Sequence, residues 1–164
     1  MRFDATIDYP ADVETVAAML GDEEFVRRKI EASGALESSQ EVIREGAAFT
    51  VTTRRRMPTD QVPASFRSLV GQSLDVRLVE AWEAPQADGS RVGTLALDIA
   101  GAPVRINGRM SLRPSGEGTV QSFSGEITAS VPLFGRHIEK AAAGAVDKVL
   151  AVERSIGLEF LAGR

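Results

Sequence analysis

The C-terminal segment from Val131 onward constrains the fold of this chain most strongly, because it forms one long amphipathic pattern. At 100° per residue, its apolar side chains fall on a stripe about 120° wide. The stripe contains Phe134, Ile138, Ala141, Ala142, Ala145, Val149, Val152, Ile156 and Phe160. A helix over residues 133–161 would be about 40 Å long. We therefore expect it to cross the width of a small sheet, with this stripe facing the strands.

The N-terminal part predicts one strand followed by two short helices. Apolar and polar residues alternate over Arg2–Tyr9, which is the period of a half-buried strand. Glycines at 21 and 34 are suitable ends for the two helices, and Asp22 can cap the second one. The two helices therefore interrupt the sheet directly after its first strand.

The middle of the chain predicts six further strands separated by turn residues. They cover residues 36–44, 48–57, 72–83, 91–99, 104–113 and 119–131. Between the second and third of these, Gln61–Gly71 predicts a short helix or a lid-like loop. The short connections favour an α+β fold, in which a curved antiparallel sheet of seven strands is covered on its concave face by the C-terminal helix. We expect one domain over residues 1–164.

The order of elements resembles the helix-grip fold of the START-like superfamily, also called SRPBCC, which includes birch-pollen-allergen-like proteins and polyketide cyclases. Within it the chain is most similar to a bacterial family of unknown function. The residues that carry this resemblance are Tyr9-Pro10, Phe25 to Gly34, Arg54 to Pro58, Glu80 to Trp82, and Val131-Pro132-Leu133 running into Ile138-Glu139-Lys140. The resemblance implies a hydrophobic cavity between the sheet and the long helix, which would bind a lipid-like molecule.

Composition excludes several classes of function. The net charge of -4 argues against nucleic-acid binding, which usually needs a basic face. With no cysteine and one histidine, His137, we expect no metal site and no cofactor. No signal peptide and no apolar run of about 18 residues is found, so we expect a cytoplasmic protein without a membrane span.

Arg55 is the first candidate for a ligand anchor. Period 2 places it on the same face as Phe49, Val51, Thr53 and Met57. An unpaired buried arginine costs several kcal/mol, and Glu80, on the face of Trp82, is a candidate partner. With or without Glu80, Arg55 would hold the polar head of a ligand. The alternatives are a bulge that turns Arg55 outward, or a structural ion pair at the sheet rim.

The remaining candidates would line the cavity. They are Met57, Phe66, Leu69, Trp82, Met110, Phe123, Phe134, Ile138, Ala142, Ala145 and Val149. Such residues are equally consistent with an ordinary core. The alanines of the helix stripe mark where helix and sheet either approach closely or leave room for a ligand. We interpret His137 as a surface residue and assign no catalytic residue.

Three functions remain open. The leading hypothesis is that the protein binds or carries a small apolar or amphipathic molecule, with Arg55 as anchor and Gln61–Gly71 as gate. The second is a START-like enzyme of the cyclase, dehydratase or hydrolase type, which needs at least two polar or titratable groups converging in the cavity. The third is a ligand-free module that binds a protein partner. The sequence does not determine the oligomeric state.

Overall fold

The elements follow the order that the sequence predicts, in a computed structural model that describes residues 1–60 and 62–164. The strands are β1 (Arg2–Tyr9), β2 (Glu37–Glu45), β3 (Ala48–Pro58), β4 (Ser73–Trp82), β5 (Arg91–Ala100), β6 (Val104–Ser115) and β7 (Gly118–Ala129). The helices are α1 (Val13–Leu20), α2 (Glu23–Ala32), the short 3-10 helix η1 (Ala64–Leu69) and α3 (Gly135–Ala162).

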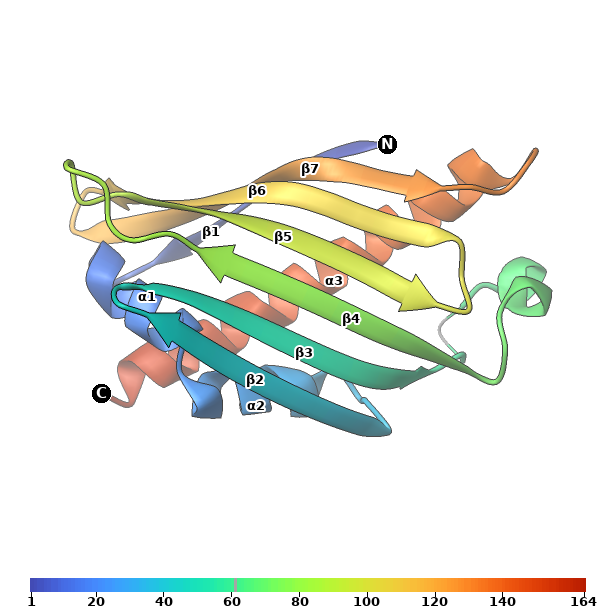
Figure 1. Ribbon diagram of the computed structural model, residues 1–164, viewed down its shortest axis with the longest axis horizontal. Coiled ribbons are helices and arrows are strands. Elements are labelled where there is room, and N and C mark those ends of the chain that lie inside the picture. Colours follow the sequence, from blue (N-terminus) through green and yellow to red (C-terminus); the bar gives the residue numbers. More distant parts are fainter. Residues whose placement is uncertain (61) are drawn as a thin grey trace.

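The seven strands form one sheet in the order β1-β7-β6-β5-β4-β3-β2, and all neighbours are antiparallel. Figure 1 shows α1, α2 and α3 together behind one face of this curved sheet, while the other face carries no helix. The predicted α+β helix-grip architecture is therefore confirmed.

The two short helices begin at aspartate caps. The Asp12 carboxylate accepts a hydrogen bond from the Thr15 backbone N–H at 2.8 Å. The predicted cap Asp22 accepts from the N–H groups of Glu24 at 2.8 Å and Phe25 at 3.3 Å. These bonds satisfy donors that the first helical turn leaves free, so local sequence alone determines where both helices begin.

A buried arginine fastens α1 to the sheet. Arg91 at the start of β5 is 5% exposed and forms two hydrogen bonds with the Glu14 carboxylate, at 3.1 and 3.0 Å. Its guanidinium also donates to the backbone carbonyls of Ala47 and Glu83. This bidentate ion pair with Glu14 compensates the buried charge of Arg91.

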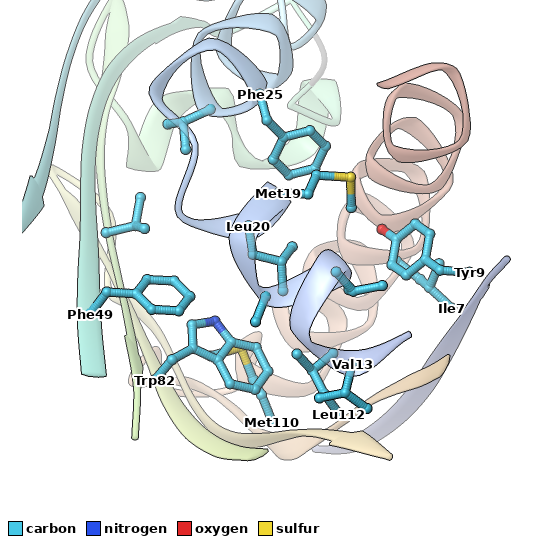
Figure 2. Packing of buried hydrophobic residues seen from close by; sticks show 14 of the residues in the cluster. Ile7, Tyr9, Val13, Met19, Leu20, Phe25, Phe49, Trp82, Met110 and Leu112 are labelled. Atoms are coloured by element: carbon cyan, nitrogen blue, oxygen red, sulfur yellow. The ribbon is translucent and has the colours of Figure 1, made fainter. Parts of the chain in front are cut away.

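The core consists of two apolar clusters on the helix-covered face. The larger contains Phe25, Phe49, Trp82, Met110 and Phe123, with residues of α1 and β1 (Figure 2). In the smaller, Val104, Ile106 and Ile127 of the sheet pack against Ile138, Ala142, Ala143 and Val146 of α3. The apolar side chains of the strands therefore pack against those of α3 along the first half of this helix, as expected.

The face that α3 presents to the interior differs from the predicted stripe by roughly 60° at 100° per residue. Val146, Leu150, Glu153 and Gly157 turn inward, whereas Val149 is 49% exposed and Val152 36%. On the inward face α3 approaches the sheet closely at Gly157, where an added Cβ would lie 2.5 Å from Cε1 of Tyr9. A close approach was one of two alternatives for the alanines of the stripe, and the structure has such an approach at Gly157. The helix also begins two residues later than the predicted residue 133, at Gly135.

Candidate functional site

A cluster of buried charges lies between the sheet and the helices. Lys29 of α2 is 8% exposed and Glu153 of α3 is 5% exposed. The ammonium Nζ of Lys29 donates to Oε2 of Glu153 at 3.4 Å and lies 3.9 Å from Oε2 of Glu80 on β4. We call Lys29, Glu80 and Glu153 the ionic cluster. One cation therefore serves two carboxylates in a site with little access to water.

Local sequence explains how each of the three side chains comes to point inward. Lys29 follows Phe25 by four residues, so both lie on the apolar face of α2. Glu80 shares its strand face with Trp82. Glu153 lies between Leu150 and Gly157 at spacings of three and four, on the inward face of α3. The sequence analysis missed Lys29 and Glu153, although their helical spacing was a signal that could have identified them.

Burial and mutual charge perturb the titration of the cluster. Burial alone would lower the pKa of Lys29, but the carboxylates of Glu153 and Glu80 outweigh it and raise that pKa. Burial raises the pKa of the Glu153 carboxyl, and Glu80 adds to the rise, while Lys29 and Arg55 oppose it. Because Lys29 is shared with Glu80, it neutralises Glu153 only in part, and the pKa of the Glu153 carboxyl stays raised.

Arg55 points to the concave side, as period 2 predicts, and it is half-buried. The predicted contact with Glu80 is wrong: among the described residues Arg55 has no ion pair within 4.0 Å, and Glu80 is paired with Lys29 instead. Burial lowers the pKa of Arg55 against the opposing effect of Glu80 and Glu153. Its Nε atom is buried and has no hydrogen-bond partner in the described part of the chain.

Further polar atoms in this region are buried without a partner among residues 1–60 and 62–164. They are the hydroxyls of Tyr9 and Thr53, Oε1 of Glu153 and the side-chain amide of Gln121. Burial, followed by the charges of Glu153 and Glu80, strongly raises the pKa of the Tyr9 phenol. Buried polar groups of native proteins nearly always have a partner, so atoms of this kind indicate where water or a ligand is accommodated.

An apolar strip lies beside Arg55 on the same concave face. It consists of Met57, Leu74, Val76 and Leu78, all of them half-buried and members of neither apolar cluster of the described chain. We call these four residues the open strip. Their incomplete burial shows that the helices do not fully cover β3 and β4 at this end of the sheet.

The other predicted lining residues are divided among different places. Trp82, Met110 and Phe123 are 2–4% exposed in the larger cluster, and Ile138 and Ala142 belong to the smaller one. Phe134 is 52%, Leu69 42% and Val149 49% exposed, and Ala145 is exposed as well. These four side chains therefore do not lie between α3 and the sheet. Phe66 of η1 is half-buried, and His137 is exposed. Of the predicted gate, Gln61 lies outside the described residues.

Two hollows lie away from the ionic cluster. One, of about 1210 Å³, is lined mainly by side chains on the outer face of the sheet, from β2 to β6. The other, of about 490 Å³, lies between Pro10, Thr15 and the C-terminal end of α3. Lys29, Glu80 and Glu153 line neither of them.

In the part of the chain that the structure describes, no helix is both long and apolar enough to span a bilayer. The same residues contain no group of three or more His, Cys, Asp or Glu side chains arranged to hold a metal ion.

Comparison with known proteins adds a family and a fold. The family model described as "Protein of unknown function (DUF2505)" matches residues 4–161. No curated protein matches the chain. Human STARD10 is 13% identical, with a TM-score of 0.62 over 98% of this chain and 64% of the STARD10 chain, so the present chain spans less than two thirds of that protein.

Two bacterial structures are similar over most of their length. A STAR-related lipid transfer protein from Xanthomonas axonopodis is 16% identical, with a TM-score of 0.59 over 95% of this chain and 85% of its own. A START superfamily protein from Mycobacterium smegmatis is 16% identical, with a TM-score of 0.58 over 98% of both chains. At these identities the similarity shows a START-like fold.

Proposed function

We propose that this chain, which belongs to the DUF2505 family of proteins of unknown function, binds a small amphipathic molecule on the concave face of its sheet. The polar group of the ligand would meet Arg55, and its apolar body would cover the open strip. The observation that carries this proposal is the buried Nε of Arg55, which has no partner among the described residues and lies next to half-buried apolar side chains.

Energetics support a ligand at this place. A buried donor without a partner costs about 1–3 kcal/mol, and more when it is charged. Half-buried apolar side chains forgo about 25 cal/mol for each Å² that stays in water. A molecule with an acceptor group and a hydrocarbon body removes both costs at once, whereas water removes only the first.

Charge favours an acidic ligand. Lys29 is committed to Glu153 and Glu80, so Arg55 is the cation without an ion pair in the described interior. A guanidinium presents parallel donors that match a carboxylate. The similarity to a protein named as a lipid transfer protein supports a hydrocarbon body for the ligand. A fatty acid is thus a suitable probe.

The test compares dodecanoic acid with dodecanol, which share a chain and differ in charge. In Arg55→Leu the affinity for the acid should fall about tenfold or more, as for loss of a charge-assisted hydrogen bond, and the affinity for the alcohol should fall about twofold or less. Arg109→Leu, exposed on the outer face of β6, is the control and should bind both probes as the wild type does. An equal effect of Arg55→Leu on both probes would rule out the anchoring role.

A second candidate function is catalysis, because more than two titratable groups converge near the open strip. Glu153, with a raised pKa and a free Oε1 atom, is the group suited to donate or accept a proton. Hydrolysis of p-nitrophenyl dodecanoate tests this alternative. Turnover that is lost in Glu153→Gln, with dodecanoic acid binding retained, would support an enzyme. Equal rates in wild type and variant would leave binding as the function.

A further inference from the structure

The outer face of the sheet carries a second candidate site, on the side opposite the open strip. Figure 1 shows this face free of helices. Its hollow of about 1210 Å³ is wide and open, and its lining comes from the strands β2 to β7. Of the residues that line the hollow, Arg55 and Val76 also belong to the proposed ligand site, and the other described ones do not.

The hollow is positively charged although the protein as a whole has a net charge of -4. Apart from Arg55, whose side chain points to the concave side, four arginines and three carboxylates line its described part. Arg56 is paired with Glu37 at 3.2 Å and with Asp75 at 3.4 Å, and Arg105 is paired with Asp98 at 3.3 Å. All three carboxylates are thus engaged by two arginines.

Arg54 and Arg77 remain without an ion pair in the described part of the chain. They stand directly opposite each other on β3 and β4, and both are exposed on the outer face. Like charges at opposed positions of an antiparallel pair destabilise the sheet. The adjacent row, where Glu37 and Asp75 flank Arg56, alternates in sign. In the row of Arg54 and Arg77, Asp98 lies opposite Arg77 on β5, but its ion pair is with Arg105.

We propose that this hollow binds a phosphate-bearing small molecule between Arg54 and Arg77. A multiply charged oxyanion can accept hydrogen bonds from both guanidinium groups, whereas a carboxylate offers one charge and two oxygens. Ser39, Asn107 and Thr128 supply further hydrogen-bonding side chains around the hollow. The described lining includes no aromatic side chain on which bases could stack, so the site suits a compact anion rather than a nucleic-acid strand.

The test uses inorganic pyrophosphate, titrated calorimetrically in sodium chloride of matched ionic strength. The wild type should bind it saturably, and Arg54→Gln and Arg77→Gln should each weaken binding about tenfold or more. Arg109→Gln, an exposed arginine of the same face outside the hollow, is the control and should bind as the wild type does. Without pyrophosphate, Arg77→Gln should unfold at the same temperature as the wild type or higher, because a like-charge contact is removed.

A second arm distinguishes a free phosphate compound from a lipid headgroup. Phosphatidylcholine vesicles with and without phosphatidic acid are floated with the wild type and with Arg77→Gln. Binding that requires phosphatidic acid and Arg77, without pyrophosphate binding, assigns the site to a headgroup; pyrophosphate binding assigns it to a free compound. The proposal is overturned if neither probe binds saturably, if the hollow variants bind as the wild type does, or if Arg109→Gln loses as much affinity as Arg77→Gln.

Discussion

Replacing Lys29 with methionine should strongly destabilise the protein, because the change removes the cation from the ionic cluster. The ammonium lies 3.4 Å from one carboxylate and 3.9 Å from the other. At an effective dielectric constant of about 20, each contact contributes roughly 4 kcal/mol of attraction. Release of the buried ammonium from its desolvation penalty offsets part of this loss. We expect a net loss of about 3–5 kcal/mol in the free energy of unfolding at neutral pH, the usual result of removing one partner from a buried ion pair.

The measurement is urea denaturation followed by the fluorescence of Trp82, the only tryptophan, which is 3% exposed in the larger cluster. Arg28→Met is the matched control. Arg28 lies in the same helix, α2, and its ion pair with Glu24 at 3.1 Å is exposed. That control should lose less than about 1 kcal/mol.

A double variant separates charge from packing. Lys29→Met with Glu153→Met removes both buried charges, and it should recover at least half of the loss, because the less exposed of the two carboxylates is no longer left without its cation. The reasoning is refuted if Lys29→Met costs less than about 1 kcal/mol, or if the double variant is no more stable than the single one.

Three further predictions concern stability. Gly157→Ala should lose about 1–3 kcal/mol, because its Cβ would lie 2.5 Å from the Tyr9 ring, whereas Gly144→Ala, with nothing within 4 Å, should gain up to about 1 kcal/mol; a gain at both positions would refute the close approach. Because the pKa of Glu153 in the folded protein is raised above its ordinary value of 4.5, the folded state binds more protons than the unfolded chain above that pH. Stability should therefore fall as pH rises through this window, and less steeply in Glu153→Gln; equal slopes would contradict the raised pKa. Leu133→Gly should leave the melting temperature unchanged or raise it, because this 93% exposed leucine adopts a φ of 68°; a lower melting temperature would reveal an unrecognised contact.

Local periodicity predicted most of the fold. Alternation identified the strands, and capping residues such as Asp22 identified helix starts, because both depend on neighbours a few residues apart. The same alternation placed Arg55 on the concave side. The ends of elements were less accurate: α3 begins at Gly135 rather than at Leu133, where the backbone has a positive φ.

The site was predicted only in part, because its charges come from distant segments. Lys29 and Glu153 are 124 residues apart in sequence, and the pattern of one helix does not reveal which residue of another it will meet. A lysine within α2 and a glutamate within α3 are each compatible with an exposed position. Glu80 was predicted to face inward with Arg55 as its candidate partner, because the strand pattern does not show that Lys29 of α2 lies beside it.

The sequence by itself determined the order of strands and helices, the length of the C-terminal helix and the inward direction of Arg55, because these follow from backbone periodicity. Only the tertiary structure decided which face of α3 is buried. Its alanine-rich stripe is apolar over a wide arc, so amphipathicity alone leaves its rotation open. The absence of a side chain at Gly157 lets the Tyr9 ring approach α3 on the face where Glu153 meets Lys29. Both contacts join residues far apart in the chain, and for that reason local periodicity does not reveal them.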